Sequence, residues 1–281
     1  MDMEKEKHIT KLINDIQSHK ITLPSLPEVA VKVRKFVDDP DMGIAQLSKA
    51  ISTDPALAAR LLQVANSPFF RCMTPSSNLN NAISRLGGVC VRNIVTSLVM
   101  AQLYKTNISG EIKGFMKDLW EHSTSVAAYS NVIAKKFTNL DAEEAMLTGL
   151  VHSIGALPIL TSASNDSELS QDFDTVVDLV TEFHTDIGKI TLEEWGFPEN
   201  MITAVADHED LDREHEGKAD LTDVITVSTL HATLGKKNHS QPRPWDEIPA
   251  FKALNLTPEQ SIDAMMEAKD EISAIQKLLS M

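Results

Sequence analysis

The sequence predicts an all-α protein with two lobes, an N-terminal helical lobe followed by a helical bundle. Apolar residues recur at helical spacing along most of the chain. We find no stretch in which β-branched residues alternate with polar ones, as half-buried strands require. Several expected helices also begin with a cap residue followed by proline, or with an acidic side chain three residues later. Together these observations exclude a sheet-based fold class.

The composition is that of a globular chain with an acidic surface. Of 281 residues, 42% are hydrophobic and 23% are charged, enough for a packed core. Lys and Arg number 26 against 40 Asp and Glu, so the formal net charge is −14. Because negative charge repels nucleic-acid phosphates and anionic lipid, we expect neither nucleic acid nor membrane as a partner.

The cysteines and the apolar runs bear on location. Cys72 and Cys90 are too few for a disulfide framework and fit a reducing compartment. The first residues lack the apolar core of a secretory signal. No apolar run approaches the ~18 residues of a membrane span; the nearest, 148–160, is shorter and contains His152. We therefore expect a cytoplasmic protein.

The N-terminal lobe, expected over residues 1–110, is predicted as a series of short helices. Their apolar stripes fall at 9–16, 29–37, 44–51, 58–65, 82–86 and 91–101. Asp54 followed by Pro55 is typical of a helix start, and Asn66 with Ser67 is typical of a helix end. We interpret these four residues as structural, since their side chains suit free backbone groups. Gly87–Gly88 is expected to close the helix over 82–86.

The second lobe is expected over residues 111–235, after a linker at 104–114. A long or broken helix is predicted from 111 to 137, and a capping box of Asp141 with Glu144 starts the next one. Further helices are expected near 174–194, 198–209 and 220–235.

The remaining residues, 236–281, are predicted as a loop and an amphipathic helix. The loop, 236–257, is expected to pack through Trp245 and Phe251. The helix, 258–279, begins with a cap, a first-turn proline and a capping-box glutamine. The sequence leaves open whether this helix docks on its own chain or on another.

Histidines in helical context are the candidates for chemistry. They are His122, His152, His184, His208 and His231. Imidazoles and carboxylates from several helices commonly hold divalent metals in hydrolases, where a metal-bound water supplies hydroxide. A single histidine is more often a surface residue or a hydrogen-bonded core residue than a metal ligand. The case for a metal site therefore depends on the order of the five histidines and on the residues that flank them.

Several motifs in sequence order resemble the HDOD family, the HD-related output domains. The N-terminal ones are LPSLPEVAVKV, ISTDPALAARLLQVANSPFF and NAISRLGGVCVRNIV. The later ones are LWEHSTSVA, AMLTGLVHSIGALPIL and EFHTDIGKITLEEWGFPENMITAVADHE, and the resemblance covers roughly residues 20–235. The resemblance implies an all-helical fold and a degenerate branch of the HD superfamily. That superfamily contains metal-dependent phosphohydrolases, whereas HDOD members are regarded as signalling or regulatory modules.

The resemblance also implies where a metal site would lie. His122 matches the histidine before the His-Asp dyad, and the dyad itself corresponds to His152 and Ser153, so its aspartate is replaced by serine. His184 and His208 resemble the downstream histidines of two-metal members. These four histidines are the weak metal-ligand candidates of a degenerate pocket.

Both carboxylates that hydrolysis needs are absent from the matched positions. Beside Ser153, the final aspartate of the family pattern is expected where Ser228 and Thr229 stand, with Thr229 at the matching place. A neutral hydroxyl is a weak metal ligand. Imidazoles could still hold one zinc or nickel ion, but we expect no bridged two-metal site. Asp207 and Glu209 flank His208 and are candidates to replace the absent carboxylates. Adjacent helical residues point in different directions, so their place in the sequence does not by itself bring them to the metal site.

We therefore expect a non-catalytic signalling module that acts through protein–protein contacts with a partner in a signalling pathway. No catalytic residue and no cofactor is expected, apart from a single divalent metal in the degenerate pocket. Two alternatives stay open. One is a metal-dependent phosphohydrolase acting on a nucleotide or cyclic dinucleotide; the other is a sensor that binds a small molecule without turnover and changes the angle between the lobes.

Overall fold

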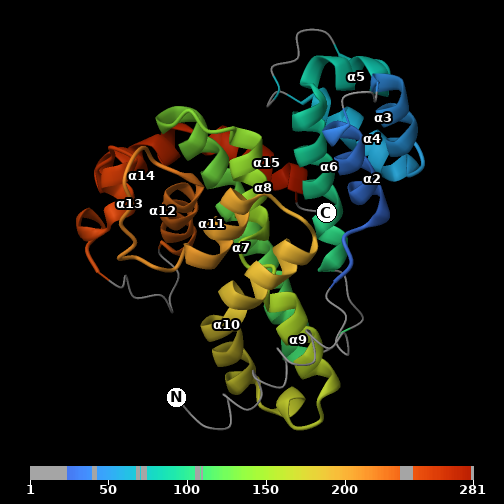
Figure 1. The fold of residues 1–281 in the computed structure, drawn as a ribbon. Coiled ribbons are helices and arrows are strands. Elements are labelled where there is room, and N and C mark those ends of the chain that lie inside the picture. The colour runs from blue at the N-terminus through green and yellow to red at the C-terminus, as the bar shows by residue number, and fades with distance from the viewer. Residues whose placement is uncertain are drawn as a thin grey trace.

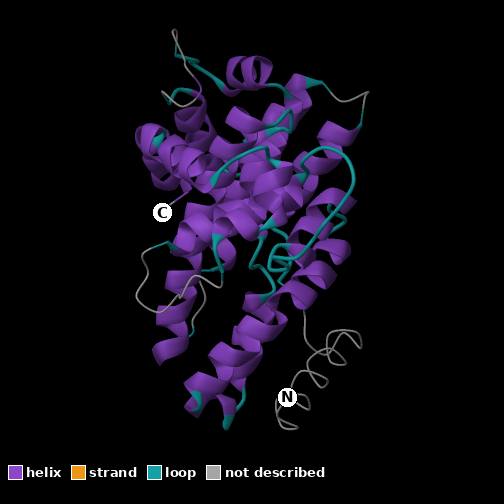
Figure 2. Ribbon diagram, turned by 90° about the vertical axis from the view of Figure 1, so that its left-hand side faces the viewer, coloured by secondary structure: helices purple, strands orange, loops and turns teal. Residues whose placement is uncertain are grey.

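The computed structural model describes residues 24–39, 43–67, 70, 75–104, 108, 110–234 and 243–279. These residues form helices and loops, and no strand occurs among them (Figure 2). The predicted all-α fold class is confirmed. The helix expected over 9–16 lies outside the described residues, as does Cys72.

Before residue 104, the described part of the chain forms five helices, of which the last is the longest and lies at the centre (Figure 1). They are α2 (Glu28–Asp38), α3 (Ile44–Ile51), α4 (Pro55–Ala65), α5 (Leu79–Leu86) and α6 (Gly88–Leu103). Asp54 caps α4 as predicted, because its carboxylate accepts the backbone N–H groups of Ala56 and Leu57, both at 3.0 Å. Gly87, at φ 82°, ends α5, whereas Gly88 already begins α6 and does not help to close α5.

The side chain of Asn66 ties the end of α4 to the residues before α5. Its Nδ2 donates to the Ser76 carbonyl at 3.0 Å, and its Oδ1 accepts the Ser76 backbone N–H at 2.7 Å. This reciprocal pair occupies both ends of the amide and fixes the path of the loop.

The following helices build a bundle around one long central helix. They are α7 (Gly110–Phe137), α8 (Ala142–Val151), α9 (Ala156–Asn165), α10 (Phe173–Glu194), α11 (Glu199–Asp207) and α12 (Leu221–Thr233), with a short 3-10 turn η2 (Leu169–Gln171). Helix α7 is continuous, so the linker predicted over 104–114 is wrong from Gly110 onward. The buried side chains of Ile112 and Met116 explain the difference, since packing overrides the weak helix propensity of Gly114.

The chain beyond α12 is more helical than predicted. It contains η3 (Trp245–Glu247), α13 (Pro249–Ala253), α14 (Pro258–Glu267) and α15 (Lys269–Leu279). Trp245 and Phe251 are buried and stack at 5.4 Å between centroids, as expected of the loop. The single helix expected over 258–279 is wrong, because the chain breaks at Ala268. After the break, α15 packs along α7, whereas Ser261 of α14 meets His231 of α12.

Helix α15 docks on its own chain. It packs along α7 and reaches α6 (Figure 1). Lys135 of α7 pairs with Glu271. At the far end, Arg60 of α4 donates to the carbonyls of Lys277 at 3.3 Å and Leu278 at 2.7 Å. The question that the sequence left open is thus answered in favour of docking within the chain.

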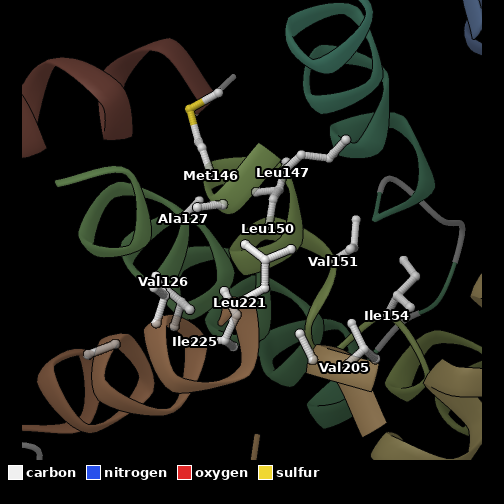
Figure 3. Close-up of a cluster of buried hydrophobic side chains, with 14 of the residues drawn as sticks. Val126, Ala127, Met146, Leu147, Leu150, Val151, Ile154, Val205, Leu221 and Ile225 are labelled. Carbon is white, nitrogen blue, oxygen red and sulfur yellow. The ribbon is translucent and has the colours of Figure 1, made fainter. Parts of the chain in front are cut away.

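Buried apolar side chains form two clusters. The smaller one lies among α2 to α6, and the larger one lies around α7, α8, α11 and α12 (Figure 3). The segment Ala142–Asn165 within the larger cluster is long and apolar enough to cross a membrane by length and composition. The expectation that no run reaches that length is therefore wrong. Other parts of the protein bury 89% of its most apolar window, as in the core helix of a globular protein.

Candidate functional site

Four of the predicted histidines converge in the larger bundle. The ring centroids of His122 and His152 lie 5.1 Å apart, those of His152 and His208 5.1 Å, and those of His184 and His208 5.5 Å. They come from α7, the end of α8, α10 and the end of α11. We refer to these four residues as the histidine cluster. The structure therefore assembles the imidazoles that the sequence motifs single out.

A backbone contact between two glycines brings the start of α9 against α10. A Cβ atom on Gly155 would lie 2.1 Å from the His184 carbonyl oxygen and 2.3 Å from the Gly188 nitrogen. Only glycine permits so close an approach. Because Gly155 follows His152 within one turn, this contact sets the spacing between His152 and His184.

Three members of the cluster share one tautomer. In His152, His184 and His208, Nδ1 lies beside a backbone carbonyl one turn earlier in the chain. The distances are 2.7 Å to Gly149, 2.9 Å to Val180 and 3.0 Å to Val205. A carbonyl oxygen can only accept, so Nδ1 carries the proton. In the neutral ring, Nε2 then presents its lone pair, the arrangement in which histidine binds a metal ion.

Two of these rings are neutral at neutral pH. Burial first, and then the neighbouring imidazoles, hold the pKa of His152 and that of His208 well below the ordinary value for histidine. Neutral imidazole is the form that ligates, so protons do not compete for the lone pairs until the pH is acidic.

One of the lone pairs has no partner. Nε2 of His208 is buried and makes no hydrogen bond, and an orphaned buried nitrogen is costly unless something binds it. Nε2 of His184 lies 3.6 Å from Oε1 of Glu209, whose side chain is 51% exposed. Ligand atoms of His184, His208 and Glu209 lie within 4.8 Å of one another. These residues fit a single borderline cation.

The dyad position carries a hydroxyl in place of a carboxylate. Oγ of Ser153 lies 3.3 Å from His152 Nε2 and 3.1 Å from Oγ of Ser123 on α7. Ser153 is buried. It therefore fills the aspartate position with a neutral hydrogen-bonding group.

Helix α12 contributes no carboxylate at the other matched position. The hydroxyl of Thr229 donates to the Ile225 carbonyl at 2.9 Å, and that of Ser228 to the Val224 carbonyl at 2.7 Å, both within the helix. The residue of α12 that does touch the cluster is Thr226, whose hydroxyl donates to the His208 carbonyl at 3.0 Å. Nothing in the local sequence distinguishes Thr226 from a helix-facing core threonine, so sequence reasoning missed it.

The two acidic residues beside His208 point in different directions, as predicted. Glu209 faces His184, whereas Asp207 lies 3.8 Å from Arg213. One flanking carboxylate therefore lies at the cluster and the other belongs to a separate ion network.

That ion network, which sequence reasoning also missed, contacts the first residues of α12 and the residue before it. Arg213 donates to both carboxylate oxygens of Asp220, at 3.2 and 2.7 Å. Nε2 of His215 lies 2.8 Å from Oδ2 of the buried Asp223, and this hydrogen bond raises the pKa of His215. Basic residues within the acidic run at 207–223 were the signal that could have found it.

The fifth histidine lies elsewhere. Nε2 of His231 is 3.1 Å from Oγ of Ser261, and its ring meets Trp245 edge-on with centroids 4.9 Å apart. Burial lowers the pKa of His231 to about 4. It is a hydrogen-bonded core residue of the C-terminal region.

The chain belongs to the HDOD family. The HDOD domain model matches residues 23–211, more than half of the sequence. This match agrees with the motifs quoted from both lobes and with the all-helical fold.

Solved structures share the whole architecture. A protein of Shewanella amazonensis SB2B named "Putative metal-dependent phosphohydrolase" is 25% identical, with a TM-score of 0.81 over 99% of this chain and 100% of its own. An HDOD domain protein of unknown function from Geobacter sulfurreducens is 20% identical, with a TM-score of 0.70 over 96% of each chain. A "Putative signal transduction protein" of Marinobacter aquaeolei VT8 is 19% identical, with a TM-score of 0.64 over 99% of this chain and 66% of its own.

A curated relative matches a part of its own length. An uncharacterized protein of Treponema pallidum is 22% identical over 242 residues, which are 82% of this chain and 46% of that protein. The chain thus spans about half the length of the curated relative that it matches.

Proposed function

We propose that this HDOD chain is a regulatory module of signal transduction that acts by binding a partner protein and hydrolyses no phosphoester. Its histidine cluster is a degenerate HD site. The acidic net charge of −14 supports a protein partner over nucleic acid or an anionic membrane.

The observation that carries this proposal is the buried Ser153 at the dyad position. Two-metal phosphoester hydrolysis needs carboxylates that bridge the metals and offset their charge. Here the hydroxyl of Ser153 lies between Ser123 and His152, and the Thr229 hydroxyl is bonded within α12. Among the residues that the structure describes, the carboxylate found at the cluster is that of Glu209, on its exposed side.

A hydrolysis assay tests the absence of turnover. The purified full chain is incubated with bis(p-nitrophenyl) phosphate, and separately with a cyclic dinucleotide, in the presence of Mn²⁺, Ni²⁺ or Zn²⁺. We expect no rate above that of His152→Ala, the matched control. A rate that EDTA abolishes and that His152→Ala loses would support the phosphohydrolase alternative and overturn the proposal.

We further propose that the cluster holds one divalent cation of the zinc or nickel type. The Nε2 atoms of His152, His184 and His208, with Glu209 at the rim, would hold it, and the buried, unpartnered Nε2 of His208 is the observation that favours it. When bound, such an ion would supply positive charge at the cluster. Imidazole ligands favour it over magnesium.

Calorimetric titration with Zn²⁺ tests the cation site. We expect one ion per chain, and loss of that binding in His208→Ala. His231→Ala is the control, because His231 lies outside the cluster among Ser261 and Trp245. Binding that persists in His208→Ala would assign the ion to other groups and contradict the site.

A further inference from the structure

A groove opens between the end of α12, the turn η3 and one face of α14. Its volume is about 760 Å³. Most of its lining side chains are apolar, among them Leu234, Pro244, Trp245 and Ile262. Helices α12 and α14 lie at the end of the molecule away from α3 to α5 (Figure 1), and no member of the histidine cluster lines the groove. The groove is therefore a feature separate from the histidine cluster.

Large apolar side chains stand exposed at two margins of this groove. Leu234 after α12 is 49% exposed, and Met266 on α14 is 70% exposed. Met266 follows Ile262 by four residues, so it continues the same helix face one turn beyond the groove. Exposed apolar side chains gathered at one groove, unlike single scattered ones, are typical of an interaction surface. Methionine suits such a surface because its flexible thioether adapts to a partner.

The free charges around the groove are negative. Asp246 and Glu259 line it. Glu247 is the next residue after Asp246, and Asp263 lies one turn after Glu259 on α14; all four are exposed. None of the four forms an ion pair with a basic side chain that the structure describes. The apolar groove thus has an acidic margin.

The basic residue that lines the groove is already engaged. The guanidinium of Arg243 donates to Asp212 at 2.6 Å and to the Leu211 carbonyl. Its charge is therefore compensated within the chain, and it does not offset the acidic margin.

We propose that this groove is the docking site of the partner protein and that it receives an amphipathic helix rich in lysine or arginine. The inference rests on the proposed function, because it gives that module a binding surface and its partner a chemistry. The apolar face of such a helix would cover Leu234, Ile262 and Met266, while its basic residues meet the acidic margin. Amphipathic helices commonly bind in apolar grooves, and complementary charge gives the contact its specificity. The same margin disfavours a second copy of this acidic chain.

Fluorescence anisotropy with a model peptide tests the groove on the full chain. The probe is a labelled helix of about 18 residues with leucine along one face and lysine elsewhere. We expect a Kd of about 10 µM that rises as salt is added. In Leu234→Glu with Met266→Glu, the Kd should rise about tenfold or more, because the apolar contacts are lost.

The matched control places the same substitutions on the other lobe. Ile44 and Val89 are 43% and 48% exposed, and both lie on helices that precede residue 104. Ile44→Glu with Val89→Glu adds the same negative charge as the groove variant, so any general attraction for a basic peptide is equal in the two. We expect the control to keep the wild-type Kd within about twofold.

A second pair of variants tests the acidic margin. Glu259→Gln with Asp263→Asn should raise the Kd about threefold and make it less dependent on salt. Glu182→Gln with Asp186→Asn is the control, since these are exposed carboxylates at the same spacing on α10. A peptide with glutamate in place of lysine should not bind the wild type.

The outcomes separate the groove from the proposed function. If the lysine peptide fails to bind, or binds the groove variant and its control equally, the groove is wrong, and the regulatory module still stands or falls by the hydrolysis assay. A dimer that the groove variant dissociates would assign the groove to a second copy. Tighter peptide binding in Lys236→Gln with Lys237→Gln would assign it to the chain's own lysines. Either result also overturns the proposal.

Discussion

A single functional group at position 153 sets the chemistry of the cluster. Three of the histidines retain the tautomer that a metal centre needs, and all four retain the mutual approach. The residue after His152 provides a hydroxyl where the HD pattern has a carboxylate. The difference is one of charge, because a buried hydroxyl forms its hydrogen bonds without the desolvation cost of a buried anion.

Restoring the carboxylate should make stability depend on a cation. In EDTA, Ser153→Asp buries a carboxylate without a positive partner and should cost about 2–4 kcal/mol of unfolding free energy. Saturating Mn²⁺ should recover most of that loss. Thermal melts of Ser153→Asp in EDTA and with Mn²⁺ measure the loss and its recovery. Ser153→Asn, of similar size but without charge, is the control. Equal responses of the two variants to Mn²⁺ would contradict the prediction.

The buried histidines predict that acid destabilises the protein. His152 and His208 have a pKa well below the usual range when folded and an ordinary one near 6.5 when unfolded. The unfolded chain therefore binds more protons once the pH falls below about 6.5. Their contribution is fully present above that pH, and about 1.4 kcal/mol per histidine is lost for each unit below it.

Urea unfolding at a series of pH values measures this slope. The midpoint concentration should fall between about pH 7.5 and about pH 5.5. His208→Gln, which removes one of the titrating groups, should make the fall shallower. A wild-type midpoint that stays constant over this range would show that the rings are protonated in the fold.

At the scale of helices, the sequence predicts what local chemistry decides and misses what packing decides. Asp54 and Thr257 mark helix starts correctly because a cap bonds to backbone groups within three residues of itself. The break at Ala268 and the short helix α13 escape prediction because burial of distant surfaces determines them. The convergence of four histidines followed from the family motifs, whereas the contacts of Thr226 and Arg213 depend on how α11 and α12 lie together.

The glycine contact between the start of α9 and α10 gives a prediction at this scale. Gly155→Ala places a methyl group against the His184 carbonyl and should cost about 3 kcal/mol or more, because backbone must shift. Gly114→Ala in α7 is the matched control. Its Cβ meets nothing within 4 Å, so the change should be neutral or stabilise the helix by about 0.5–1 kcal/mol. Equal melting temperatures for the two variants would argue against the contact.

At the scale of the molecule, two arginines of the N-terminal helices hold the second bundle. Arg34 donates to the carbonyls of Trp195 and Gly196 and covers the Phe197 ring at 4.3 Å. Arg60 holds the end of α15. The lobes are therefore joined at two separate places. At both places the acceptors are backbone carbonyl groups, which are present whatever side chain the residue carries.

Loss of the second arginine should loosen α15 first. Arg60→Ala removes the donors to the Lys277 and Leu278 carbonyls, and we expect faster amide hydrogen exchange in α15 with little change in α7. Arg85→Ala serves as a control, since its guanidinium contacts the Ala65 carbonyl within the N-terminal helices. Unchanged exchange in α15 would mean that packing on α7 alone fixes the helix.

The contact between Arg60 and Leu278 joins residues 218 positions apart. Contacts between residues so far apart in sequence raise the contact order and slow folding. Leu278 also packs against the smaller core. The first described helices are thus completed by nearly the last described residues, so we expect the lobe that begins the sequence to acquire its full stability only once α15 has docked.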